Sequence, residues 1–459
     1  MEKPDRKWFP TTPQEIRAFI GINMIMGIDR KPSIAHYWST DPFLGNQGIQ
    51  SVMPRERFEA LCRYIHLNDS TRMPGRDDAN HDPLYKLRPL VDMCQRNFKE
   101  CYTPGRDLSV DEGMIKYKGR VHFRQYMPKK PVKYGIKVWM VAESKTGYVS
   151  NYDIYLGKPR GSDRGETGLA TKVVLDITEP FQYCNRHVFF DNFFTSVALM
   201  EELLRRGTYA CGTLRADRYP DTYKTSKAGG RKQGKKIKAG ELCQLQKGSM
   251  VVTLWYDKRQ VGMLSTNCNP NEQVTVQRRS KAPPHTVDVA IPTPVHLYNH
   301  SMGGVDLNDQ LRSYYPSGRS GKKWWRFIFW YLLDVSICNA FIVEGQSSHR
   351  ASSRSRRSLL SFKLELAKQL IGGFWGRKKY AGKKRKSTNL DNALSLPNLP
   401  GHREVKLEGR KGACINCSVC GRRNPSGRTP ETVFGCDRCG VHLCRSGCFL
   451  EYHTENSHV

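Results

Sequence analysis

Three segments of this 459-residue chain carry aspartates in settings that suit metal chemistry. They are LSVDEGMIKYKGR with Asp111, VFFDNFFTS with Asp191, and GGVDLNDQ with Asp306 and Asp309. The first two aspartates lie in or just after segments that read as strands, and neighbouring strands present their ends side by side at a sheet edge. Carboxylates that converge there repel one another, and two divalent cations relieve that repulsion during in-line phosphoryl displacement. Each aspartate taken singly also fits a cap or turn residue.

The setting of Asp191 is the least ordinary of the three. An ionised carboxylate within the apolar run VFF-D-NFF is costly unless it is paired or binds a metal. Glu112 adjoins Asp111, but successive side chains of a strand point to opposite faces, so we interpret Glu112 as structural.

The C-terminal segment carries paired ligands with the spacing of tetrahedral zinc sites. Seven of the fifteen cysteines fall in the last 46 residues, which are too few to bury much core without metal. We expect two structural zinc ions in a cross-braced arrangement, and Cys414 is a spare that could replace one ligand. The expected sets are Cys417, Cys420, Cys444 and Cys448 for one ion, and Cys436, Cys439, His453 and His458 for the other.

Basic and aromatic residues indicate contacts with a nucleic acid. Seven lysines and arginines lie between Asp221 and Glu241 without an acidic residue, and such a run can follow a phosphate backbone or form a solvated loop. The stretch KKWW (322–325) could stack on a base, although tryptophans at helical spacing are more often core residues. The expected DNA-binding residues are Lys224, Lys227, Arg231, Lys232, Lys235, Lys236, Lys238, Lys322, Lys323 and Trp324.

Composition favours an intracellular nucleic-acid-binding protein. The formal net charge of +31 predicts a polyanionic partner, either a nucleic acid or, less favoured, an acidic membrane. We see no window near the roughly 20 apolar residues that span a bilayer, and no signal peptide at the start. The clustered cysteines indicate a metal module in a reducing compartment and not a secreted disulfide framework. RKKYAGKKRK (377–386) fits a nuclear localisation signal or a DNA-contacting linker.

The order of predicted elements favours an α/β fold. TTPQEIRAFIGINMIMGI opens with a helix-start signal, and residues to about 106 look helical. From Asp107 the pattern predicts three strands, a helix (166–178), a strand at HVFFD, a helix and a strand, which is typical of a mixed sheet with helices on both faces. A hairpin is expected around DKRQ, and residues 322–345 read as a long, mostly buried helix.

The chain resembles the piggyBac-type DNA transposases and the proteins derived from them. The resemblance rests on SVDEGMIKYKGR, FRQYMPKKPVKYGIKVWM, FFDNFFTS, HLYNHSMGGVDLNDQL and the terminal cysteine module, in that order. It implies a ribonuclease-H-like catalytic core, α+β in class, with a β-rich insertion and a split helical domain. The implied order is a helical dimerisation and DNA-binding domain (1–106), core (107–213), insertion (214–284), core (285–315), helical domain (316–376), basic linker (377–412) and cysteine-rich zinc-binding domain (413–459).

The resemblance also implies the activity. Asp111, Asp191 and Asp306 take the three catalytic Mg²⁺-binding positions, and Asp309 matches a further catalytic carboxylate. The implied reactions are nicking of transposon ends, hairpin formation and joining at TTAA targets, by a nuclear homodimer acting on double-stranded DNA. Neither a membrane nor a small-molecule substrate is expected.

Two functions remain open from the sequence. The aspartates favour an active transposase, whereas the absence of the long acidic N-terminal arm of full transposases leads us to expect a truncated or shortened family member and favours a domesticated DNA- or chromatin-binding protein. A secreted cysteine-rich protein is a distant third reading.

Overall fold

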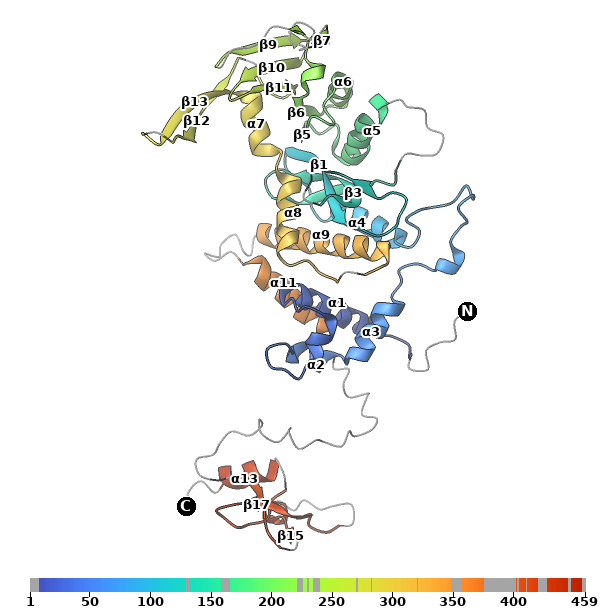
Figure 1. Cartoon of the computed structure of the whole chain (residues 1–459), viewed down its shortest axis with the longest axis vertical. Helices are drawn as coiled ribbons and strands as arrows, with labels where there is room; N and C mark the ends of the chain where they lie inside the picture. Colours follow the sequence, from blue (N-terminus) through green and yellow to red (C-terminus); the bar gives the residue numbers. More distant parts are fainter. Residues whose placement is uncertain are drawn as a thin grey trace. The chain divides into compact units, whose positions relative to one another are not determined.

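We describe the fold from a computed structural model of the whole chain. The residues that the structure describes are 8–128, 130, 132–157, 166–220, 226–228, 231–233, 240–269, 271–281, 283–319, 321–347, 357–374, 402, 404–409, 411–419, 427–444 and 447–455. The chain divides into two compact units, residues 1–380 and 381–459, and each is described by itself (Figure 1).

A mixed β-sheet forms the centre of the first unit. Its strands follow the order β2, β3, β1, β5, β6, β11, β10, β9, and β4 pairs with β3 next to β2. β1, β5 and β6 run parallel to one another. β3 runs antiparallel to both of its neighbours β1 and β4. The bounds are β1 (Asp107–Lys116), β2 (Gln125–Tyr126), β3 (Tyr134–Glu143), β4 (Val149–Ile154), β5 (His187–Phe190) and β6 (Tyr209–Leu214).

Apolar side chains alternate between the two faces of this sheet, and helices cover both. One face buries Leu108, Val110 and Val188 against α5 and α6, and the other buries Ile115, Ile136 and Met140 against α4, α8 and α9. The expectation of a mixed sheet with helices on both faces is confirmed. The helices are α4 (Arg88–Glu100), α5 (Glu166–Thr178), α6 (Val197–Arg205), α7 (Thr293–Ser301), α8 (Gly304–Tyr314) and α9 (Trp324–Gln346), with the 3-10 turns η3 (Glu179–Phe181) and η4 (Ala216–Arg218).

Helix α9 corrects one expectation from the sequence. The helix has 23 residues, and an 18-residue window within it reaches a mean hydropathy of 1.6, so it is long and apolar enough to cross a membrane by length and composition. The helix instead packs against the β1–β3 face, with Ile328, Leu332 and Val335 almost fully buried in the main core (Figure 1). Its apolar character is therefore explained by a central position in the core of the folded unit.

The N-terminal helices form a second, smaller core. The predicted start of α1 is confirmed, because the Thr12 side chain accepts a hydrogen bond from Glu15 N and Pro13 opens the helix. Phe19 and Phe58 lie in this core, and α11, from far along the chain, packs on α1 (Figure 1). The elements are α1 (Pro13–Ile28), η1 (Ile34–Trp38), α2 (Gln47–Val52), α3 (Arg55–Tyr64), η2 (Ser70–Arg72) and α11 (Leu359–Ile371).

Strands β9, β10 and β11 extend the same sheet, whereas β7 with β8 and β12 with β13 form separate two-stranded sheets. β11 pairs with Leu214 and its neighbours in β6, so the segment expected as an insertion is joined to the central sheet by backbone hydrogen bonds. The hairpin expected around DKRQ is confirmed as β10–β11. The bounds are β7 (Ser226–Ala228), β8 (Arg231–Gln233), β9 (Leu242–Lys247), β10 (Met250–Tyr256), β11 (Gln260–Ser265), β12 (Gln273–Arg279) and β13 (Thr286–Pro292).

The second unit is small and rich in cysteine. Two short antiparallel pairs, β14 with β17 and β15 with β16, accompany two helices around a core of Cys414, Cys417, Cys436, Leu443 and Cys448. Its elements are β14 (Glu404–Lys406), β15 (Gly412–Ala413), α12 (Ile415–Val419), β16 (Glu431–Thr432), β17 (Phe434–Cys436) and α13 (Gly447–Glu455).

Candidate active site

Asp111 and Asp191 come together because of strand register. β1 and β5 run parallel with Val110 opposite Phe190, and β5 ends there, so Asp191 emerges beside Asp111. Backbone amides fix both carboxylates: Glu112 N donates to Asp111 Oδ1 at 2.7 Å, and Phe193 N donates to Asp191 Oδ1 at 2.9 Å. Thr195 Oγ1 donates to the Asp191 carbonyl oxygen at 2.9 Å and closes the turn after the strand.

Both carboxyl groups lie in a partly buried, crowded setting. Burial raises the pKa of Asp111 to about 7, and the charges of Glu112 and Asp191 act in the same direction. Burial also raises the pKa of Asp191, and Glu112 adds to the effect. A carboxyl group that burial and like charges destabilise in its ionised form is one that a cation would stabilise.

Helix α8 brings Asp306 to the same face of the sheet. A Cβ at position 304 would lie 2.5 Å from Ser109 Oγ and 2.7 Å from the Glu143 carbonyl oxygen, so only glycine lets the start of α8 approach β1 and β3 this closely. Asp306 follows in the first turn and remains exposed. The charges of Asp306 and Asp111 both act to raise the pKa of Lys130.

Asp309 lies one turn further along α8 and has a different partner. Arg312 Nη2 donates to Asp309 Oδ1 at 3.0 Å, and the guanidinium lies 4.4 Å from the ring centroid of Tyr331 on α9. The structure therefore places Asp309 in a helix-packing contact. Among the described residues, the aspartates do not form a group of three whose ligand atoms all lie within 4.8 Å.

Two lysines that we did not predict flank the carboxylates. Lys130 Nζ lies 3.1 Å from Glu112 Oε1, and Lys137 Nζ lies 3.8 Å from Glu112 Oε2 and 3.7 Å from the ring centroid of Trp139. Burial lowers the pKa of Lys137, whereas the charges of Asp111, Glu112 and Asp306 outweigh burial and raise the pKa of Lys130. For Lys130, the sequence offered one signal: the MPKKP stretch, in which two lysines lie beside proline.

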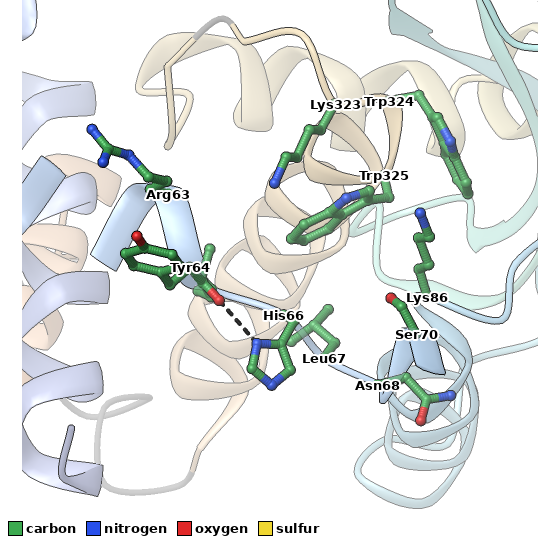
Figure 2. A pocket seen from close by; sticks show the side chains of 11 residues that line it. Arg63, Tyr64, His66, Leu67, Asn68, Ser70, Lys86, Lys323, Trp324 and Trp325 are labelled. Atoms are coloured by element: carbon green, nitrogen blue, oxygen red, sulfur yellow. Dashed lines mark hydrogen bonds between the residues drawn. The ribbon is translucent and has the colours of Figure 1, made fainter. Parts of the chain in front are cut away.

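Two basic grooves lie near the start of α9. The first, of about 380 Å³, is lined by Arg63, Lys86, Lys323 and Trp325 among others, and its lining contains no carboxylate (Figure 2). Burial and the charges of Arg326 and Lys86 lower the pKa of Lys323, which indicates crowded cations.

Of the residues expected to bind DNA here, Lys323 and Trp324 line this groove, and Lys322 lines the second groove. Trp324 is partly buried and packs edge-on against Phe123 at 5.3 Å between ring centroids, so its ring is largely a core contact.

The second groove is larger, about 810 Å³, and runs beside the end of β1. Its one acidic lining residue, Asp334, is paired with Lys363 at 3.1 Å. Its basic lining residues are Arg30, Lys116, Lys118, Arg120, Arg312, Arg319 and Lys322.

The basic run before Glu241 is described only in part. The backbone of Lys227, Arg231 and Lys232 forms the β7–β8 pair. Lys224, Lys235, Lys236 and Lys238 lie outside the described residues.

The cysteine-rich unit contains two clusters with the geometry of metal sites. The described ligand atoms within each cluster lie within 4.8 Å of one another, and the clusters are Cys414, Cys417, Cys444 and Cys448, and His402, Cys436, Cys439 and His453. The first contains three of the expected ligands with the spare Cys414, and the second contains three with His402. Cys420 and His458 lie outside the described residues.

His402 was not predicted because it lies well before the cysteine run. Its Nδ1 is 3.3 Å from Cys436 Sγ and 3.4 Å from Cys439 Sγ, and His453 Nε2 is 3.6 Å from Cys439 Sγ. In the other cluster, burial and the neighbouring thiols raise the pKa of Cys444 to about 11. Four soft ligands gathered in this way suit a tetrahedral zinc ion.

Comparisons with known proteins agree with this architecture. The family model described as Transposase IS4 matches residues 1–341. The human PiggyBac transposable element-derived protein 3 is 27% identical over 455 residues, covering 97% of this chain and 70% of that protein. This chain belongs to the piggyBac transposase family.

A further relative and a solved structure are also similar to this piggyBac-family chain. The human PiggyBac transposable element-derived protein 2 is 28% identical over 337 residues, which are 72% of this chain and 55% of that protein. A cryo-EM structure of a piggyBac transposase synaptic complex with hairpin DNA matches with a TM-score of 0.68 and 26% identity, over 96% of this chain and 89% of that one.

Proposed function

We propose that this piggyBac-family chain is a cut-and-paste DNA transposase that cleaves and joins strands by metal-dependent phosphoryl transfer. The observation that carries the proposal is the meeting of Asp111 and Asp191 at paired parallel strands, with α8 bringing Asp306 to the same face. The strand order β4-β3-β1-β5-β6, with three parallel strands after an antiparallel pair, supports the ribonuclease-H-like core that the resemblance implies.

The residues present fit two magnesium ions. Magnesium prefers carboxylate oxygens, and Asp111, Asp191 and Asp306 supply them. Burial raises the pKa of Asp111 to about 7 although the charge of Lys130 opposes the rise, so a bound cation would further favour the ionised carboxylate. When bound, magnesium would neutralise charge on the phosphate and lower the pKa of the attacking water.

The chain's own residues position the reacting groups. The amides of Glu112 and Phe193 orient the two strand-end carboxylates, so little reorganisation is needed during the reaction. Lys130 and Lys137 offset the negative charge that the carboxylates concentrate. Cationic side chains in this position also suit the approach of a phosphodiester.

The basic grooves support double-stranded DNA as the substrate. Their lysines and arginines would neutralise backbone phosphates and release counterions. Binding of DNA would thus explain why the chain carries a net charge of +31. We include in the proposal recognition of transposon ends, joining at TTAA targets, action as a homodimer in the nucleus, and two structural zinc ions in the C-terminal unit.

Cleavage of labelled DNA with cognate transposon ends tests the proposal. The wild-type protein is expected to nick and form hairpins only with a divalent ion. Asp191→Asn is expected to reduce the rate by at least about 100-fold, because several kcal/mol of transition-state stabilisation depend on the metal site. Glu100→Gln, at the exposed end of α4, removes one negative charge as Asp191→Asn does and is expected to retain the wild-type rate. Unchanged cleavage by Asp191→Asn would refute the metal-site assignment.

The second candidate is a domesticated DNA- or chromatin-binding protein without transposition. It is favoured by the relatives, which are named as proteins derived from transposable elements. Under this alternative, DNA binding weakens steeply with salt and no divalent ion supports cleavage. Retained binding with no cleavage in Mg²⁺ or Mn²⁺ would select it over the transposase.

A further inference from the structure

Two exposed tyrosines lie ring against ring, in a tilted arrangement, at the outer edge of the sheet. Tyr126 on β2 lies directly opposite Tyr134 on β3, and their ring centroids are 4.7 Å apart with 34° between the ring planes. The exposed fractions of the two residues are 57% and 42%. Large aromatic surface left in water in this way is a ready partner for another flat apolar group.

The surroundings of the pair are strongly basic. A groove of about 650 Å³ beside Tyr134 is lined by Lys116, Lys118, Arg124 and Lys133, with Val132 and no acidic residue. Within the described part of the chain, no carboxylate forms an ion pair with these four side chains. A flat aromatic surface beside uncompensated cations matches a ligand that carries both π faces and phosphates.

This groove continues toward the candidate active site. Lys116 and Lys118 line both this groove and the larger basic groove, which reaches Arg312 on α8. Tyr134 also points to the same face of the sheet as Asp111, because Asp111 opposes Met140 and residues 134 and 140 share a face. Six residues of strand separate the two positions by about 20 Å, which is about six steps of one strand of B-form DNA.

Cross-strand pairing explains part of this arrangement. An aromatic pair opposite one another stabilises a short hairpin. That role accounts for the contact of Tyr126 with Tyr134, and the Arg124 guanidinium, 5.4 Å from the Tyr134 ring centroid, adds a cation–π contact. Neither contact requires the exposure of the rings or the three lysines beside them. Arg124 has a local role too, since Nη1 donates to the carbonyl oxygens of Lys118 and Gly119 at 2.9 and 3.0 Å.

We propose that Tyr126 and Tyr134 form a stacking platform for an unpaired base of the DNA strand that leaves the active site. Lys116, Lys118 and Lys133 contact the phosphates on either side of that base. The proposal rests on the proposed function, which supplies DNA as the nucleic acid. Stacking on a π face tolerates any base, so the platform adds affinity for unpaired DNA without reading its sequence.

The test compares two DNA duplexes, one blunt and one with a short single-stranded tail that carries a fluorescent adenine analogue quenched by stacking. With the full chain, the Tyr126→Leu/Tyr134→Leu variant is expected to weaken binding of the tailed duplex by roughly 5- to 150-fold, the range that corresponds to loss of a base–aromatic stack. Binding of the blunt duplex is expected to stay unchanged, and quenching of the tail to disappear.

Two matched variants control the interpretation. Tyr126→Phe/Tyr134→Phe keeps both rings and is expected to retain tail affinity and quenching. Tyr183→Leu makes the same substitution at a tyrosine that is 70% exposed just after η3 and is expected to change neither. Leucine keeps apolar cover over the hairpin, so the Leu variant is expected to lose only the roughly 0.2–1 kcal/mol of an aromatic cross-strand pair and to melt only slightly below the wild type.

The outcomes separate this inference from the proposed function. Equal weakening of tailed and blunt duplexes, or unchanged binding and quenching in the Leu variant, would overturn the platform even if the wild-type protein cleaves DNA. A wild-type protein that binds and quenches the tail but cleaves nothing would support the platform and count against the transposase.

Discussion

At the scale of single residues, the candidate active site is a concentration of negative charge that the protein compensates only in part. Asp111 and Asp191 are brought together in a partly buried place, where burial raises the pKa of both. Lys130 pairs with Glu112 at 3.1 Å and acts on Asp111 from there. Glu112 is thus the carboxylate that holds the lysine, which agrees with interpreting it as structural.

The two aspartates of α8 are expected to respond differently to removal of charge. Asp306→Asn should reduce cleavage by at least about 100-fold and change the free energy of unfolding by less than about 1 kcal/mol, since Asp306 is exposed near a helix N-terminus. Asp309→Asn should cost about 1–3 kcal/mol of stability because it leaves the Arg312 guanidinium without its carboxylate.

Cleavage assays and urea unfolding of both variants check this prediction. If Asp309→Asn unfolds like the wild type but loses cleavage, Asp309 belongs with the metal-binding carboxylates after all.

At the scale of elements, register and close packing build the site. The parallel pairing of β1 with β5 ends where the aspartates begin, and Gly304 lets α8 lie against β1 and β3. Contacts at the opposite ends of these strands also hold them together. His187 opens β5, lies opposite Asp107 of β1, and packs its ring edge-on against Tyr209 of β6 at 5.3 Å.

Protonation of His187 is expected to make these strands pH-sensitive. Burial lowers the pKa of His187, and the charge of Arg106 acts in the same direction while Asp107 opposes it. The folded state therefore binds the proton less readily than the unfolded state. Stability is expected to be full above the unfolded pKa of about 6.5 and to fall as pH drops toward the folded value.

Urea unfolding at pH 7 and pH 5 measures this effect. His187→Phe keeps a ring against Tyr209 but cannot titrate, so its stability should fall less than that of the wild type over this interval. His66→Gln, at an exposed position, is the control and should follow the wild type. Parallel losses in the wild type and His187→Phe would show that other groups control the pH dependence.

At the scale of the whole molecule, two compact units reach stability by different means. The first buries a large apolar core around the sheet, with α9 at its centre. The second surrounds its small core with cysteines and histidines, so its folding free energy depends on metal. His402, the first described residue of this unit, lies against Cys436 and Cys439.

Metal content of the full chain tests this ligand assignment. His402→Ala is expected to lower the zinc content from two ions to one after dialysis against a chelator, because it removes one of four clustered ligands. His458→Ala is expected to retain both ions, since each described cluster already contains four ligands. The reverse result would restore the set expected from spacing alone.

The local elements followed from the sequence because each depends on neighbouring residues. Thr12 and Pro13 predicted the start of α1, and the alternation from Asp107 predicted β1. The spacing of Cys436, Cys439 and His453 predicted a metal site. The length and apolar content of residues 322–345 predicted the long helix, and the same properties also suit a membrane span, which we did not expect.

Contacts between residues far apart in the chain follow from the tertiary structure alone. Strand pairing joins Asp111 to Asp191, Gly304 sets how closely α8 approaches, and the loop before β3 brings Lys130 to Glu112. His402 and the paired Tyr126 and Tyr134 become significant only once folding has placed their partners. Periodicity and spacing carry local conformation, whereas the charges and rings that complete a site are selected by packing across the whole core.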